Sequence, residues 1–316
     1  MEYRHYRGGE EEALVACWND ALPLDQVSLQ RFCKTTLLDI NFEPEGLIEA
    51  WEGESLQGFV HAVAERGAGP GDGWIPALAV APSARRRGVA TALLERARAF
   101  LAARGCRRML VSPYAPGYYY PGVPVDRYPG STELFEAAGF GVAYEAVAMD
   151  LDLTAYETPP VVLEAQGRLE AQGWHFGPIS PPWYVRAVEL CGRFAEDWAS
   201  AARAALRRPI APTQLQVATL GEEIGGFALA GGYDEHAERF GPFGVDERLR
   251  GRGLGNILLH RTLAQMAGDG LHTAWFLWTG EHDAAGRLYR RAGFRVTRRF
   301  RIYTDDLAPA RAEENP

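Results

Sequence analysis

The chain is poor in cysteine and has no long apolar run. Its four cysteines, among 316 residues, are Cys17, Cys33, Cys106 and Cys191, and no two of them form a CxxC pair. So few thiols exclude a disulfide framework and predict a cytoplasmic chain with reduced cysteines. No stretch reaches the roughly 20 apolar residues that a membrane-spanning helix needs. Residues 1–7 are polar and charged, so no signal peptide is expected.

Patterns typical of metal sites and of serine hydrolases are missing as well. The seven histidines are scattered, and neither an HExxH nor a Cys/His cluster occurs, so we expect no metal. No GxSxG nucleophile elbow is present. The formal net charge of -8 disfavours nucleic acid and anionic membranes as partners. The chain of 316 residues is long enough for two globular domains, and a hydrophobic content of 47% is typical of a folded protein.

A diverged internal repeat organises the chain. In the first copy an apolar segment, residues 74–80, is followed by four residues and then by Arg-Arg-Arg-Gly-Val-Ala at 85–90. In the second copy the apolar segment is 240–245, and Arg-Gly-Arg-Gly-Leu-Gly follows at 250–255. A helical apolar periodicity comes after each motif. The repeat therefore predicts a strand, a glycine-containing loop and a helix, twice.

A second shared pattern lies further along each copy, where a short helix ends in an aromatic residue followed by x-x-x-Gly-Phe. The aromatic residue is Phe135 in the first copy and Tyr289 in the second. The glycine suits a helix C-cap, and a strand follows it in each copy, over 142–153 and 294–303.

Two helices and a hairpin are expected upstream in each half. The helices are predicted at 11–18, 28–37, 182–191 and 195–206, and the strands at 47–51, 57–64, 214–220 and 224–230. This order predicts an α/β fold with two domains in tandem, each a mixed central sheet flanked by helices. The expected domains are 1–155 and 165–316, with a link near 153–170 that contains Pro159-Pro160.

The physical chemistry of Arg-x-x-Gly-x-Gly between a strand and a helix indicates an anion site. Glycines let several N–H groups point into one concavity, and the helix start adds its positive dipole end. Arginines add forked, charged donors. The combination predicts a pyrophosphate cradle that needs no metal. A P-loop would end in Gly-Lys-Ser/Thr, and a dinucleotide fingerprint would have GxGxxG; neither spacing fits.

The motif resembles the Gln/Arg-x-x-Gly-x-Gly/Ala signature of the GNAT (Gcn5-related N-acetyltransferase) superfamily, and the resemblance covers nearly the whole chain, twice. It implies acetyl-CoA as cosubstrate and a primary amine of a small molecule or peptide as acceptor, with self-association left open. By the resemblance, loop amides hold the CoA pyrophosphate at Arg85, Arg86, Arg87, Gly88, Val89 and Ala90, and at Arg250, Gly251, Arg252, Gly253, Leu254 and Gly255. The preceding strand of such proteins carries a bulge whose amides bind the acetyl carbonyl and the pantetheine arm, which points to Leu78, Val80, Phe243 and Val245.

The resemblance also implies a role for Tyr289, because a tyrosine at that position in the family often protonates the departing CoA thiolate. Phe135 has no hydroxyl, so the C-terminal domain is expected to be catalytic. The N-terminal domain then acetylates by another route, binds CoA without turnover, or serves as a scaffold. Tyr289 is equally compatible with a core aromatic residue.

Two questions stay open at this point. The candidates for a general base are the loop residues Asp234, Glu235, His236 and Glu238, all of which are equally compatible with solvated side chains. A non-catalytic CoA sensor, or a scaffold with degenerate domains, is the alternative to an enzyme.

Overall fold

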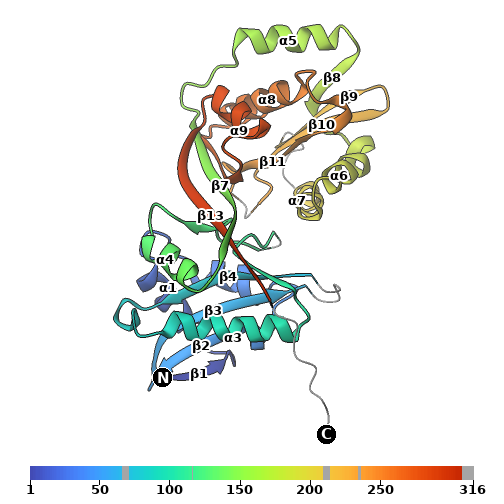
Figure 1. Cartoon of the computed structure of the whole chain (residues 1–316). Coiled ribbons are helices and arrows are strands. Elements are labelled where there is room, and N and C mark those ends of the chain that lie inside the picture. Colours follow the sequence, from blue (N-terminus) through green and yellow to red (C-terminus); the bar gives the residue numbers. More distant parts are fainter. Residues whose placement is uncertain (66–70, 116, 209–213, 234–235, 308–316) are drawn as a thin grey trace. The chain divides into compact units, whose positions relative to one another are not determined.

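The computed structural model describes residues 1–307 except 66–70, 116, 209–213 and 234–235. It divides into two compact units (Figure 1). The first unit consists of residues 1–146 together with the chain from Arg298 onward, and the second is Val147–Thr297. In each unit a sheet is flanked by helices, which confirms the predicted α/β fold class with two domains in tandem. Within the described residues, no helix has the length and apolar character needed to span a membrane.

The first unit is built on a sheet with the strand order β1-β2-β3-β4-β5-β13, in which β4 and β5 form the parallel pair. The short strand β6 pairs with β13. The strands are β1 (Glu2–His5), β2 (Leu47–Glu52), β3 (Ser55–Ala64), β4 (Asp72–Val80), β5 (Arg108–Val111), β6 (Val123–Pro124) and β13 (Arg295–Asp306).

Four helices accompany this sheet: α1 (Glu11–Ala21), α2 (Leu29–Phe32), α3 (Val89–Ala103) and α4 (Pro129–Ala137). Helix α3 packs against β2, β3 and β4 and lies across them in Figure 1. Helix α1 packs against β3 and β4, and its Trp18 stacks on Phe59. The helix expected over 28–37 begins with Ser28 as its N-cap but continues beyond α2 as a π-helical turn, Cys33–Leu37.

The second unit contains an antiparallel sheet with the strand order β11-β10-β9-β8. Helix α8 covers β9, β10 and β11, while α6 and α7 pack on each other, α6 against β10 and α7 against β11. The elements are β8 (Trp174–Pro178), α6 (Tyr184–Gly192), α7 (Glu196–Arg207), β9 (Leu215–Leu220), β10 (Glu223–Ala230), β11 (Phe240–Val245), α8 (Leu254–Gly268), β12 (Thr273–Thr279) and α9 (Ala284–Arg291).

The range 153–170, which the sequence suggested as a link, contains a further helix, α5 (Pro160–Glu170). Pro160 is compatible with the first helical turn, because the N–H that proline lacks would have no partner there. Val162 is buried, and α5 packs against α8 and β8. The proline pair therefore marks a helix start.

The last strand of the chain belongs to the sheet of the first unit. Strand β13 pairs antiparallel with β5, with Thr304 opposite Leu110. Conversely, β7 (Gly141–Asp152) leads into the second unit, where its residues from Val147 onward pair with β12. Periodicity predicts a strand but not the strand with which it pairs. The expected boundaries, 1–155 and 165–316, therefore assign β13 to the second domain, whereas it pairs with β5 of the first unit.

Candidate functional site

Strand β4 leaves a row of amides open where it diverges from β5. A bulge at Ile75–Pro76 breaks its register with β3, and β5 ends at Val111, opposite Ile75. Beyond this point the Ala81 amide donates to the Gln57 carbonyl at 2.9 Å. Because N–H directions alternate along a strand, every second amide before Ala81 faces β3. The amides of Leu78 and Val80 therefore point to the side that β5 has left.

Strand β11 repeats this arrangement in the second unit. Its bulge lies at Gly241–Pro242, and the Asp246 amide donates to the Gly225 carbonyl at 2.9 Å. By the same alternation the amides of Phe243 and Val245 point away from β10. In both units the bulge precedes the predicted amides instead of containing them. Proline accounts for its position, since a residue without N–H cannot donate to the ladder.

The loops at 85–90 and 250–255 have the same backbone conformation. Arg85 has φ and ψ of -65° and 155°, and Arg250 has -61° and 153°. The next residue is left-handed in both loops, with φ of 60° at Arg86 and 82° at Gly251. A left-handed residue between extended and helical backbone turns successive N–H groups toward one side, which is the geometry of an anion-binding nest.

A left-handed glycine then begins the helix in each unit. Gly88 (φ 77°) is the N-cap of α3, and Gly253 (φ 91°) is the N-cap of α8. The first residues of the helices, Val89 and Leu254, are buried and anchor the helix starts. Because the first helical N–H groups have no partner within the helix, each loop presents free donors and a positive dipole end.

The arginines of the first loop have different surroundings. Arg85 donates to the carbonyls of Ala21 at 2.8 Å and of Val80 at 3.3 Å, so its guanidinium braces the loop. Arg86 and Arg87 form exposed ion pairs with Glu133 and Glu52. Such pairs contribute little to stability and exchange easily for another anion.

The second loop has two arginines, of which one is ion-paired. Arg250 is paired with Glu247 at 3.2 Å. No ion pair within the described part of the chain includes Arg252. Ala90 of the first loop corresponds to Gly255, where a Cβ would lie 3.3 Å from the ring of Phe243.

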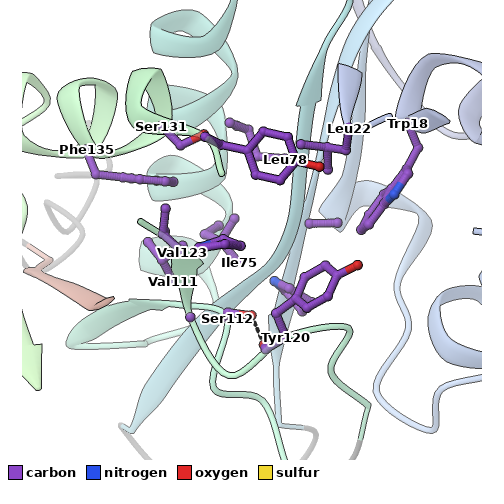
Figure 2. Close-up of a pocket in the computed structure, with 15 residues that line it drawn as sticks. Trp18, Leu22, Ile75, Leu78, Val111, Ser112, Tyr120, Val123, Ser131 and Phe135 are labelled. Atoms are coloured by element: carbon purple, nitrogen blue, oxygen red, sulfur yellow. Dashed lines mark hydrogen bonds between the residues drawn. The ribbon is translucent and has the colours of Figure 1, made fainter. Parts of the chain in front are cut away.

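Four side chains at the divergence of the strands differ between the units. In the first unit they line a mainly apolar cavity of about 80 Å³ that is open to solvent, and they are Ile75, Leu78, Val111 and Phe135. Figure 2 shows α4, through Ser131 and Phe135, facing Trp18 of α1 and Leu22, which directly follows α1, across this cavity. The corresponding register positions of the second unit are all aromatic: Phe240, Phe243, Phe276 and Tyr289.

Tyr289 lies inside that aromatic cluster. Its ring centroid is 4.5 Å from that of Phe276, and only 7% of the residue is exposed. Within the described residues its hydroxyl has no hydrogen-bond partner. Burial raises the pKa of Tyr289, so the hydroxyl stays protonated at neutral pH. Both sequence readings of this residue, an acid and a core aromatic, are compatible with its surroundings.

The base candidates are only partly described. Asp234 and Glu235 lie outside the described residues. The His236 ring is 5.8 Å from that of Trp275, and the backbone carbonyl of Glu238 accepts from the Trp275 amide at 3.0 Å. The described residues contain no group of three His, Cys, Asp or Glu side chains that could hold a metal ion.

Sequence reasoning missed a polar cluster beside the cavity of the first unit. Arg298 of β13 forms a bidentate pair with Asp25, with both N–O distances 2.9 Å, and its guanidinium lies 4.6 Å from the Tyr120 ring. Tyr128, which lines the cavity, is the N-cap of α4. Asp25 and Arg298 are 273 residues apart, so no local pattern could have joined them.

Comparisons with known proteins give a family for each unit. The model described as "Acetyltransferase (GNAT) family" matches residues 11–119, and that described as "Acetyltransferase (GNAT) domain" matches 212–296. No curated protein is similar enough in sequence to count as a relative.

Solved structures extend the likeness to the whole fold. A GCN5-related N-acetyltransferase from Sphaerobacter thermophilus has a TM-score of 0.71 at 16% identity, covering 98% of this chain and 96% of that chain. A tandem GNAT protein from the clavulanic acid biosynthesis pathway has a TM-score of 0.63 at 16% identity, with 98% and 99% covered.

A third structure is a glucosamine N-acetyltransferase region within a fungal multi-domain GH3 beta-N-acetylglucosaminidase. It has a TM-score of 0.76 at 18% identity, over 96% of this chain but only 38% of that chain. At such identities the likeness establishes the fold and leaves the substrate open. Since the two family models match separate parts of the chain, the chain belongs to the GNAT superfamily of acetyltransferases, as a member with two GNAT domains in tandem.

Proposed function

We propose that the protein is an acetyl-CoA-dependent N-acetyltransferase that acts on a primary amine of a small molecule or peptide. The observation that carries the proposal is the duplicated donor site. Each unit places a nest of free amides at a helix start and, on the preceding strand, two amides on its open side. The nest fits a pyrophosphate, and the strand amides fit a pantetheine arm and a thioester carbonyl.

The chemistry at the second unit follows from these positions. The neutral amine attacks the thioester carbonyl, and the amide of Phe243 or Val245 stabilises the oxyanion that forms. The carbon–sulfur bond then breaks, and Tyr289 donates its proton to the departing thiolate. The hydroxyl of Tyr289 is protonated at neutral pH, and the tyrosinate left after the transfer regains a proton from solvent. The amine proton leaves to solvent or to a base near β11.

Replacement of Tyr289 by phenylalanine tests this role. Removing a general acid lowers the rate of CoA release by about 100-fold in the second unit, while acetyl-CoA affinity stays within about twofold because the ring is retained. The assay is thiol release with a panel of primary amines. Tyr156→Phe is the matched control, since this hydroxyl is hydrogen-bonded to Nδ1 of His260 on α8.

The alternative is a CoA-binding sensor without turnover. It requires tight acetyl-CoA binding with no amine-dependent CoA release at any pH. That result, in wild-type protein against the full amine panel, would refute the enzymatic proposal while leaving the donor sites intact.

A further inference from the structure

The cavity of the first unit continues the row of open amides on β4. The loop at 85–90 follows this strand, and the amides of Leu78 and Val80 lead back from the loop to the divergence at Ile75. Ile75, Leu78 and Val111 all line the cavity. A pantetheine arm that extends from the loop along these amides therefore carries its thioester, and the acyl group on it, to the cavity.

Three polar side chains of the cavity wall are already engaged with the protein itself. The Ser112 hydroxyl donates to the carbonyl of Tyr120, as the dashed line in Figure 2 shows. The Tyr120 ring lies under the guanidinium of Arg298, 4.6 Å from it. The Tyr128 hydroxyl has the Asp25 carboxylate as its hydrogen-bond partner. The wall that remains for a ligand is therefore mainly apolar, and it favours apolar ligand atoms.

The volume of the cavity exceeds what an acetyl group fills. About 80 Å³ is open in the first unit, and one water-sized group needs roughly 10–15 Å³ of such volume, so about five groups fit. An acetyl group consists of one carbonyl and one methyl group. Two further methylenes on the acyl chain would fill apolar space that acetyl leaves empty.

Aromatic rings occupy the equivalent positions of the second unit. The ring centroid of Tyr289 is 4.5 Å from that of Phe276 and 6.0 Å from that of Phe240, distances typical of rings in contact. Phe243 reaches the start of α8, where a Cβ on Gly255 would lie 3.3 Å from its ring. The aliphatic side chains of the first unit thus leave room for a chain that these rings exclude from the second.

We propose that the first unit binds an acyl-CoA whose aliphatic chain has three or four carbons, whereas the second unit is restricted to acetyl-CoA. The inference rests on the proposed function, because it takes the donor to be held by the same amides. Ile75, Leu78 and Val111 select the chain by the space they leave. Each methylene moved from water to such a wall raises the affinity about fourfold.

Calorimetric titration with acetyl-, propionyl- and butyryl-CoA tests the proposal without knowledge of the acceptor. In Gly253→Asp, which blocks the second cradle, butyryl-CoA should bind about 10-fold more tightly than acetyl-CoA, and propionyl-CoA should lie between them. In Gly88→Asp, which leaves only the second site, butyryl-CoA should bind no more tightly than acetyl-CoA. A flat series in Gly253→Asp, or the same preference at both sites, would overturn the inference.

Exchanging one side chain between the units shows whether the cavity causes the preference. Val111→Phe, in Gly253→Asp, should abolish the preference for butyryl-CoA and change acetyl-CoA affinity by less than about threefold, which is below the effect of one methylene. Val142→Phe is the matched control at a residue that is 49% exposed, and it should keep the preference. An undiminished preference in Val111→Phe would refute the role of the cavity.

The reverse exchange keeps the test decisive if Val111→Phe no longer binds acetyl-CoA. Phe276→Val, in Gly88→Asp, opens space in the second unit and should create a preference for butyryl-CoA of about fourfold; no gain would overturn the inference. Acetyl-CoA binding in wild type but no acyl-CoA binding in Gly253→Asp would refute the inference and leave the proposed function standing. Wild-type protein that binds none of the three acyl-CoAs would refute the proposed function itself.

Discussion

The two GNAT units share their backbone and differ in their side chains. The cradles agree closely in φ and ψ, and both strands leave alternate amides open after a proline-containing bulge. Around the opening, however, Ile75, Leu78 and Val111 of the first unit correspond to phenylalanines in the second. If backbone amides bind acetyl-CoA as proposed, binding depends on the backbone conformation, and the surrounding side chains can differ between the units.

The difference in side chains changes the space at the opening of each unit. Aliphatic side chains leave a cavity in the first unit, whereas the rings of Phe240, Phe243 and Phe276 pack on Tyr289 in the second. Packed rings exclude water and strengthen electrostatic interactions at a reacting centre. The units are therefore two versions of one site, one open and one tightly lined.

The largest expected effect comes from separating the units. A fragment of residues 1–155 lacks β13, and with it the buried Phe300, Ile302 and Tyr303 and the partner of Asp25. Removing one partner of a buried ion pair costs about 3–5 kcal/mol, a large share of the roughly 5–15 kcal/mol of a typical domain. Arg127, which lies 3.9 Å from Asp25, is retained in the fragment but makes no bidentate pair. We expect no cooperative denaturant unfolding from this fragment by circular dichroism.

A fragment in which residues 295–307 follow 155 through a flexible glycine–serine linker is the control, and it should recover a cooperative transition. A sharp transition from 1–155 alone would show that the exchange of β13 is dispensable.

The second prediction is that the two glycine-containing loops bind acetyl-CoA independently of each other. Gly88→Asp and Gly253→Asp each place a carboxylate beside the bound phosphates and strain a left-handed residue. Each should weaken acetyl-CoA at its own site by about 100-fold, from about 3 kcal/mol of repulsion. Gly105→Asp and Gly270→Asp are the controls, since these glycines follow the other ends of α3 and α8 with φ of 82° and open space around them. Loss of both sites from one substitution would contradict independent cradles.

The smallest expected effect concerns a buried histidine in the sheet of the first unit, where the second unit has a leucine. His61 of β3 is 2% exposed, neither ring nitrogen has a partner, and burial lowers its pKa to about 3. The corresponding residue of β10 is Leu229. The unfolded chain protonates this imidazole below about pH 6.5, whereas the folded chain does so only near pH 3. The contribution to the free energy of unfolding is therefore complete above about pH 6.5 and is lost as the pH falls toward about 3.

At pH 5 this loss amounts to about 2 kcal/mol. His61→Leu should reduce the difference in unfolding free energy between pH 7.5 and pH 5 by that amount in urea titrations. His272→Leu, at an exposed histidine, should leave the difference unchanged. An unaltered pH dependence in His61→Leu would mean that the ring is hydrated in the folded state.

The parts that local sequence controls were predictable. Gly88 and Gly253 are needed because the helix starts require φ above zero, which a motif reveals directly. The helix in 153–170 was missed because Pro159-Pro160 suits a helix start as well as a linker. The partner of β13, the Asp25–Arg298 pair and the cavity depend on contacts between distant segments, for which a single sequence carries no signal.

The measurement closest to the central claim is a calorimetric titration of the full chain with acetyl-CoA. Two cradles of equal backbone geometry predict two binding sites per chain, and Gly88→Asp or Gly253→Asp should each reduce the count to one. A chain that binds no acetyl-CoA while folded would contradict the account, because both cradles would then be features of the fold without a ligand.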